Sequence, residues 1–186
     1  MPAGTISKNT LHAAGCYPES IMASNLQNLS KYDPAEVPAA NGMRFGIVVS
    51  DWNSEITHNL LVGCIHTLQQ FGAAENDIII HHVPGSFELP SGARMLTEAC
   101  KPDALICLGC VIQGETKHFD YICQGVTRGI TDLNLRYNLP FIFGVLTTDN
   151  LDQARERSGG KHGNKGDEAA ISAIRMIHLK RQLGSK

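Results

Sequence analysis

Residues 114–121, which read GETKHFDY, bring polar side chains of several chemical kinds together directly after an apolar run. His118 carries an imidazole, whose ordinary pKa near neutrality lets it give and take protons at physiological pH. Glu115 and Asp120 are the less favoured alternatives for a proton-accepting base. This composition predicts proton transfer at the end of a buried strand, provided that the surrounding elements form a site.

Those elements follow from the hydrophobic pattern, which becomes regular at Arg44. Four short apolar runs predict buried strands, and the segments between and after them repeat apolar residues at helical spacing. The predicted strands cover 44–50, 77–83, 103–112 and 140–148, and the predicted helices cover about 56–71, 89–100, 119–133, 150–157 and 167–182. Alternating strands and helices predict an α/β fold: a three-layer αβα sandwich with a four-stranded parallel sheet covered on both faces.

Each predicted strand ends in a polar cluster. The clusters read SDWN (50–53), VPGSFE (83–88), QGETKH (113–118) and TTDN (147–150). In open α/β sheets, ligands bind at the carboxyl ends of the strands, where the free N–H groups of helix starts also favour anions. The four clusters therefore predict one composite pocket, and 114–121 is a strand-to-helix turn within it.

The composition excludes several classes of protein. The chain has 186 residues and a formal net charge of −2, which does not suit a nucleic-acid binder. It shows neither an apolar run of membrane-spanning length nor a secretory signal, so we expect a cytoplasmic protein without membrane partners. Most of the six cysteines lie in apolar segments, as reduced core thiols do.

Residues 1–43 differ from the rest, being rich in Ser, Asn, Ala, Gly and Pro. We interpret 1–43 as a flexible N-terminal arm and 44–186 as a single catalytic domain. Met22 offers a second possible start, so that residues 1–21 would lie outside the working protein.

Two apparent metal motifs are discounted. Cys107 and Cys110 spell C-x-x-C, but they lie within a strand run and have no second pair. His81 and His82 are adjacent on a strand and would point to opposite faces. We expect no metal site.

Five segments together resemble the 6,7-dimethyl-8-ribityllumazine synthase family of riboflavin biosynthesis. They are RFGIVVSDWN, VPGSFELP, GCVIQGETKHFDYI, FGVLTTDN and RSGGKHGNKGDEAA, in family order and spacing. The resemblance implies a flavodoxin-like fold and a transferase that condenses 5-amino-6-(D-ribitylamino)uracil with 3,4-dihydroxy-2-butanone 4-phosphate, releasing phosphate and water. It implies no metal and no organic cofactor. A protein on this fold that binds flavin or lumazine, or forms a shell, without turnover is the alternative.

The resemblance assigns roles to the residues of the reacting groups. His118 matches the proton carrier, its alternative being a helix-capping or packing histidine. Gly114, Glu115 and Thr116 match the phosphate-binding turn, where backbone N–H groups and a hydroxyl donate. Arg157 matches the phosphate arginine, with a solvated helix-end residue as the alternative.

The resemblance also assigns the residues that hold the pyrimidine and its ribityl chain. Trp52 would stack on the ring, unless it is a core tryptophan. Further contacts are implied for Ser86, Phe87 and Glu88, for the backbone of Cys110, Val111 and Ile112, and for Phe143. Phe143 and Arg157 would come from a neighbouring subunit. Lys165 could contact the ligand, but a solvated loop lysine explains it equally well. Arg155 is interpreted as a surface residue.

The same family forms pentamers, and some members assemble twelve pentamers into a 60-subunit capsid. The short link RSGGKHGNKG favours the capsid. The resemblance suggests that the N-terminal arm adds a strand to a neighbour's sheet. Because this arm is long and could interfere with capsid assembly, the pentamer is the alternative. Riboflavin synthase is an implied partner. Gln113 departs from the family pattern, which commonly has Arg or Lys there, and removes a positive charge beside the phosphate turn.

Overall fold

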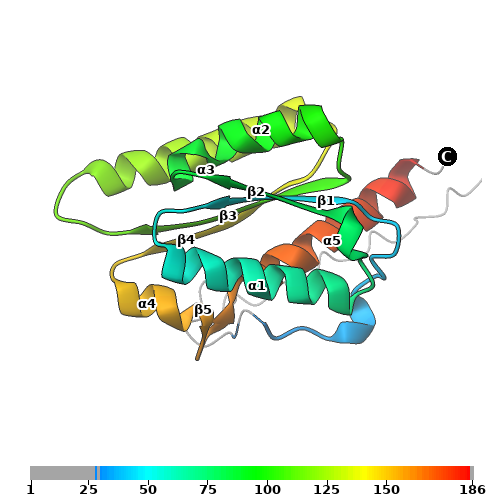
Figure 1. Cartoon of the computed structure of the whole chain (residues 1–186), viewed down its shortest axis with the longest axis horizontal. Coiled ribbons are helices and arrows are strands. Elements are labelled where there is room, and N and C mark those ends of the chain that lie inside the picture. Colours follow the sequence, from blue (N-terminus) through cyan, green and yellow to red (C-terminus); the bar gives the residue numbers. More distant parts are fainter. Residues whose placement is uncertain (1–27, 29, 185–186) are drawn as a thin grey trace, which may run out of the picture.

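The computed structural model describes residue 28 and residues 30–184 and contains the predicted three layers (Figure 1). Its sheet is wholly parallel, with strand order β2-β1-β3-β4. The strands are β1 (Phe45–Ser50), β2 (Ile78–Val83), β3 (Ala104–Ile112) and β4 (Phe141–Thr148), and the helices are α1 (Ser54–Gln70), α2 (Leu89–Cys100), α3 (His118–Arg136), α4 (Leu151–Glu156) and α5 (Lys165–Gly184). The predicted α/β fold with four parallel strands is confirmed.

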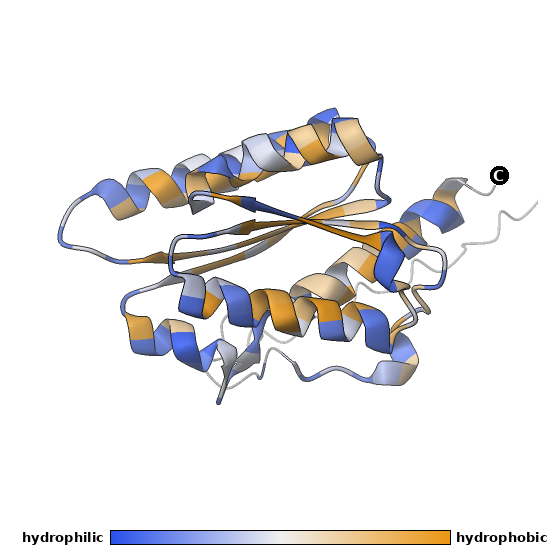
Figure 2. Cartoon of the chain, viewed as in Figure 1, coloured by the Kyte–Doolittle hydropathy of each residue, from blue (hydrophilic) through white to orange (hydrophobic). Residues whose placement is uncertain are grey.

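Two apolar clusters hold the layers together, one on each face of the sheet. Phe45, Ile47 and Val49 of β1 point to the face covered by α1 and α5, whereas Val48 points to the face covered by α2 and α3. This alternation follows from the pleat of a strand. Figure 2 shows apolar strands between helices that expose more polar residues. Burying a large aliphatic or aromatic side chain contributes roughly 1.5–3 kcal/mol, so the strands anchor the fold.

The carboxyl ends of the four strands meet at one edge of the sheet, at the left of Figure 1. Helix α1 begins at Ser54, four residues after β1 ends, and α3 begins at His118. Short connections of this kind place helix starts beside strand ends, as the parallel topology requires. The strand ends and helix starts on which the predicted composite site depends therefore lie at one edge of the sheet.

Two features of the sheet region differ from the sequence-based expectation. Strand β2 was expected to be buried, but it is an edge strand and Ile80, His81 and His82 are exposed. The glycine-rich link forms a small antiparallel hairpin, β5 (Ser158–Gly160) and β6 (Gly163–Asn164), which periodicity did not predict.

The described part of the N-terminal segment packs against the layer of α1 and α5. Val37, Ala40 and Met43 are buried, and the rings of Tyr32 and Phe71 lie 5.8 Å apart. A short 3₁₀ helix, Pro34–Glu36, is capped by the Asp33 side chain. Residues 1–27 and 29 lie outside the described part, so the prediction of a flexible arm is not tested there.

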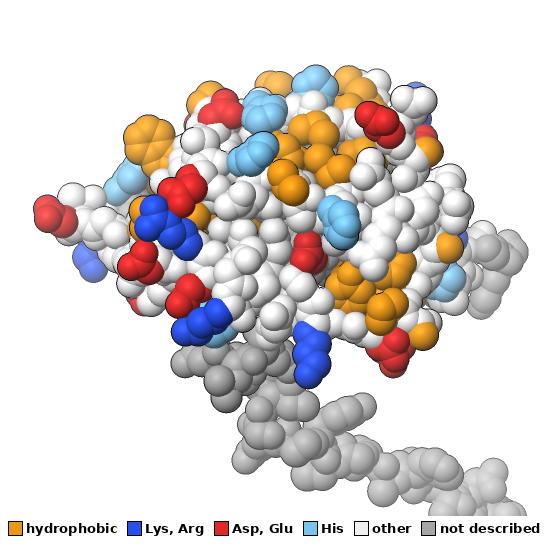
Figure 3. All heavy atoms as spheres, turned by 60° about the horizontal axis from the view of Figure 1, so that its bottom comes forward, with side chains coloured by type: hydrophobic (Ala, Val, Ile, Leu, Met, Phe, Trp, Pro, Cys, Tyr) orange, Lys and Arg blue, Asp and Glu red, His pale blue; other side chains and the backbone are white. Residues whose placement is uncertain are grey.

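The described surface mixes charges of both signs. On the face that Figure 3 shows, acidic and basic side chains lie next to one another at the left, and apolar and histidine side chains gather in other parts of the face. Within residues 28 and 30–184, no helix has both the length and the apolar character that a membrane crossing requires.

Candidate functional site

A cavity of about 710 Å³ opens at the carboxyl edge of the sheet. Ten of the predicted site residues line it: Trp52, Ser86, Phe87, Glu88, Cys110, Val111, Ile112, Gly114, Thr116 and His118. They come from the connections that follow β1, β2 and β3, from the last residues of β3 and from the start of α3. Three of the four polar clusters thus meet in one place, as expected for this edge.

The floor of the cavity is tied together by the turn after β1. The backbone N–H of Trp52 donates to the carbonyl oxygen of Pro84 at 3.1 Å, which extends the β1–β2 ladder beyond the strands. Asn53 adopts a left-handed conformation (φ 62°), and its Nδ2 donates to the carbonyl oxygen of Cys110 at 3.0 Å. Asn residues tolerate this conformation better than most. The Trp52 side chain is left 73% exposed at the rim.

One wall is formed by the 3₁₀ turn Ser86–Glu88. Ser86 is buried, and its hydroxyl donates to the Cys110 carbonyl oxygen at 3.5 Å. The Phe87 ring packs over Gly125 of α3, where a Cβ would lie 2.8 Å from the ring, and yet Phe87 remains 58% exposed. An exposed aromatic ring that is fixed by its neighbours is suited to contact a ligand.

The opposite wall is the start of α3. The backbone N–H of His118 donates to Thr116 Oγ1 at 3.4 Å, and the His118 side chain is exposed at the cavity. Glu115 and Asp120 do not line the cavity, and Asp120 lies 3.9 Å from the Lys117 ammonium. Of the three predicted candidates for proton transfer, only His118 therefore lines the cavity.

The two cysteines of the C-x-x-C sequence are separated by the sheet. Cys107 packs in the cluster under α2 and α3, and Cys110 packs in the cluster on the other face. Burial raises the pKa of each thiol to about 12, so neither is a nucleophile near neutrality. Among the described residues, no group of three or more His, Cys, Asp or Glu is placed to hold a metal ion.

Phe143 and Arg157 do not line the cavity of the single chain. Phe143 lies on β4 and is 36% exposed. Arg157 follows α4, is half-buried, and donates from Nη1 to the carbonyl oxygen of Gln153 at 3.1 Å. Lys165 also lies outside the cavity, where its Nζ pairs with Glu168 at 2.5 Å.

Arg155 is a surface residue, as predicted. Its guanidinium is exposed and bonds both oxygens of Glu55, at 2.7 and 3.1 Å. This pairing lowers the pKa of the Glu55 carboxyl. Arg155 therefore lies in a surface ion pair and outside the cavity.

Sequence reasoning missed five residues that line the cavity: Asn53, Pro84, Gly85, Phe119 and Ile122. The first three stand inside polar clusters that the sequence had already placed at this edge. Phe119 and Ile122 were assigned only to the helix core. Phe119 directly follows His118 and Ile122 lies one helical turn after it, and these positions were the available indication of a second role.

Known proteins resemble this chain over most of its length. The family model described as 6,7-dimethyl-8-ribityllumazine synthase matches residues 42–181. A 6,7-dimethyl-8-ribityllumazine synthase of Parabacteroides distasonis is 55% identical over 158 residues, which is 85% of this chain and 99% of the relative. The protein of that name from Porphyromonas gingivalis is 52% identical (86% and 99%), and that from Cytophaga hutchinsonii is 55% identical (84% and 98%).

Proposed function

The chain belongs to the 6,7-dimethyl-8-ribityllumazine synthase family, and we propose that its cavity is the pyrimidine-binding part of the active site. As a transferase of riboflavin biosynthesis, it condenses 5-amino-6-(D-ribitylamino)uracil with 3,4-dihydroxy-2-butanone 4-phosphate and releases phosphate and water. The observation that carries the assignment is the meeting of Trp52, Ser86–Glu88, Cys110–Ile112 and His118 in one cavity.

The pyrimidine is held between an aromatic surface and the sheet edge. The exposed Trp52 indole offers a flat face for stacking on the ring. Backbone groups of Cys110, Val111 and Ile112 recognise the ring edge, so the protonated Cys110 thiol takes no part in the chemistry. Phe87 walls the pocket, and the Glu88 carboxylate accepts hydrogen bonds from ribityl hydroxyls.

The sugar phosphate is bound at the start of α3. Gly114, Glu115 and Thr116 supply backbone N–H groups and a hydroxyl, and the positive end of the helix dipole favours the anion. Arg157 and Phe143 complete the site from a neighbouring subunit, which is why neither lines the cavity of its own chain. Gln113 contributes no charge, so Arg157 is the main cation for the phosphate.

His118 moves the protons that the reaction requires. The free amine of the pyrimidine attacks the ketone and water leaves, which forms an imine. Phosphate then departs, and the ribitylamino nitrogen closes the second ring with loss of water. Each of these steps transfers a proton to or from nitrogen, oxygen or carbon, and an exposed imidazole at the cavity wall can serve each of them.

We expect a closed assembly, because each site needs two chains. Five chains of 20.2 kDa make a particle of about 100 kDa, and sixty make one of about 1.2 MDa. The short link between α4 and α5 favours the larger particle, and light scattering distinguishes the two. Riboflavin synthase, which would consume the product, is the predicted partner. A cytoplasmic location agrees with the five described cysteines, all of which are free.

The test uses the purified wild-type protein with both substrates. We expect the absorbance of the lumazine to rise together with free phosphate, in equal amounts and faster than in the protein-free mixture. A protein that binds the pyrimidine but leaves the rate at the protein-free value would be the non-catalytic alternative and would refute the proposed function.

The phosphate role of Arg157 predicts a selective loss in Arg157→Ala. A charge-assisted, bidentate contact contributes about 1.5–3 kcal/mol, so we expect the KM for the butanone phosphate to rise about 10- to 100-fold. The KM for the pyrimidine should change much less. Equal losses for both substrates in steady-state assays would exclude this role.

A further inference from the structure

The hairpin β5–β6 carries Arg157 at its base. Ser158, the residue after Arg157, is paired with Asn164 across the hairpin. The backbone N–H of Lys165, the residue after Asn164, donates to the carbonyl oxygen of Arg157 at 2.9 Å. Whatever fixes Asn164 therefore also fixes the main chain of Arg157.

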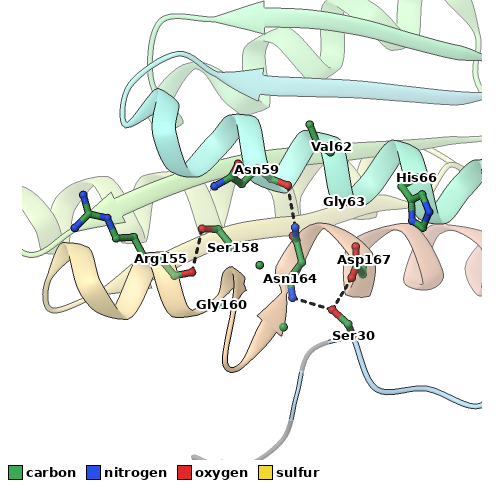
Figure 4. Close-up of a pocket in the computed structure, with 12 residues that line it drawn as sticks. Ser30, Asn59, Val62, Gly63, His66, Arg155, Ser158, Gly160, Asn164 and Asp167 are labelled. Atoms are coloured by element: carbon green, nitrogen blue, oxygen red, sulfur yellow. Dashed lines mark hydrogen bonds between the residues drawn. The ribbon is translucent and has the colours of Figure 1, made fainter.

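Asn164 is itself held on two sides (Figure 4). It is only 9% exposed, and its Nδ2 donates to the carbonyl oxygen of Asn59 in α1 at 2.8 Å. Its Oδ1 accepts the backbone N–H of Gly166, at the start of α5, at 2.8 Å. A buried amide that uses both its donor and its acceptor in this way holds three elements in one geometry.

The third contact comes from the N-terminal segment. The Ser30 hydroxyl accepts the backbone N–H of Asn164 at 2.9 Å and donates to Asp167 Oδ2 at 2.5 Å. The other oxygen of Asp167 accepts the Thr67 hydroxyl of α1 at 3.2 Å. Ser30 thus joins a network that starts in α1 and ends at the hairpin.

Two glycines allow groups of this network to approach one another closely. A Cβ at Gly63 would lie 2.4 Å from Asn164 Nδ2, and one at Gly166 would lie 2.0 Å from the carbonyl oxygen of Leu60. Glycine is required where elements approach this closely. We call the hydrogen-bonded set Ser30, Asn59, Asn164, Gly166 and Asp167 the Asn164 cluster. Four of its members, Ser30, Asn59, Asn164 and Asp167, line a groove of about 700 Å³.

We propose that Asn164 is a positioning residue for Arg157, and that Ser30 of the N-terminal segment supports it. The proposal rests on the phosphate role assigned to Arg157 above. The Asn164 cluster sets where the guanidinium stands at the base of the hairpin, and Arg157 does the binding. A displacement of about 1 Å at such a group can cost up to 10²-fold in the reaction it serves.

The test compares steady-state kinetics of Asn164→Ala, Arg157→Ala and the double variant, each in the full-length assembly. We expect Asn164→Ala to raise the KM for the butanone phosphate about tenfold and to leave the KM for the pyrimidine within about twofold. In the Arg157→Ala background, the same change should add nothing, because residues that act through one group are not additive. Ser30→Ala should show the same selectivity with a smaller rise, and it serves if Asn164→Ala fails to fold.

Asn134 provides a matched control. Its side chain also bridges a helix and a strand, donating to the carbonyl oxygens of Ile130 and Phe141 at 3.1 and 2.8 Å and accepting the Phe141 N–H at 2.9 Å. It lies near the C-terminal end of α3 and does not line the substrate cavity. Asn134→Ala should lower stability without changing either KM selectively.

Amide hydrogen exchange reports on the positioning without any assay of activity. Asn164→Ala should speed exchange at the Lys165 N–H and leave the Phe141 N–H unchanged, and Asn134→Ala should do the reverse. Three results would each overturn the proposal: unchanged exchange at the Lys165 N–H in Asn164→Ala, equal rises of both KM values in Asn164→Ala, or a further loss in the double variant relative to Arg157→Ala. If Arg157→Ala keeps the wild-type KM for the butanone phosphate, Arg157 has no phosphate role and Asn164 no positioning role. If the wild-type protein shows no turnover, the proposed function itself is refuted.

Discussion

The side chains of the substrate cavity and those of the Asn164 cluster differ in their exposure to solvent. In the cavity, Trp52, Phe87 and His118 are exposed. In the Asn164 cluster, Asn164 is buried and bonded on each side, and glycines allow the backbones to touch. Both regions belong to one active site in our proposal, but only the first brings the predicted substrate-binding residues of one chain together in a cavity.

This contrast separates recognition from positioning. Groups that will bind a substrate must remain available to it, whereas groups that aim a side chain must already be satisfied. We therefore expect changes at the exposed side chains of the cavity to lower activity at constant stability, and changes in the Asn164 cluster to lower stability, activity or both. The predictions below test this division, from the largest expected effect to the smallest.

The glycines of the two regions should respond very differently to an added methyl group. At Gly166 the new Cβ would meet the Leu60 carbonyl oxygen at 2.0 Å, whereas at Gly114 it would meet nothing within 4 Å. We expect Gly166→Ala to lower the free energy of unfolding by about 3 kcal/mol or more. Gly114→Ala should change it by less than about 0.5 kcal/mol. Urea unfolding at matched protein concentration measures both, and similar losses would erase the contrast.

Removal of the imidazole should slow the reaction without weakening the fold. We expect His118→Ala to lower kcat by about 10²-fold at most, the lower range of acid–base effects, because holding both reactants together still helps. His58→Ala, a change at another exposed histidine, should leave kcat unchanged. Complete loss of turnover in a folded His118→Ala protein would show that His118 does more than transfer protons.

Removal of the indole should weaken one substrate. Stacking of a base on an aromatic side chain contributes about 1–3 kcal/mol, so we expect Trp52→Ala to raise the KM for the pyrimidine by about 5- to 150-fold. Trp52→Phe should retain most of the affinity. Because Trp52 is 73% exposed, the unfolding midpoint should not move. A large drop in stability would instead identify Trp52 as a packing residue.

Replacement of the cavity cysteine should have the smallest effect. With its pKa raised to about 12 by burial, the Cys110 thiol stays protonated across the working range of pH. Cys110→Ala should keep kcat/KM within about twofold, and the pH–rate profile of both proteins should show no thiol ionisation. A shifted profile in the variant would contradict the assignment of backbone contacts to this residue.

The sequence predicted what is local and periodic. The α2 boundaries, Leu89–Cys100, agree with the predicted helix. Strong apolar runs also gave the four strands, and the polar residues at their ends gave most of the cavity. Asn53 was missed as a lining residue because its contribution depends on a hydrogen bond to Cys110, which is 57 residues away.

What the sequence could not predict depends on contacts between distant segments. The hairpin β5–β6 follows no hydrophobic period, and its glycines read only as a flexible link. The apolar run of β2 resembles that of a central strand, although β2 is at the edge with exposed His81 and His82. No local pattern connects Ser30 to Asn164, because 134 residues separate them.

The central claim is that His118 of one subunit and Arg157 of its neighbour form one site. Co-expression of His118→Ala and Arg157→Ala chains, with purification of the mixed assemblies, tests it directly. Random mixing leaves both groups intact at about a quarter of the interfaces. With the butanone phosphate well below its wild-type KM, where each variant alone turns over slowly, we expect about a quarter of the wild-type rate. Mixed assemblies no more active than the two variants measured separately would mean that both residues act within one chain, and would contradict the account.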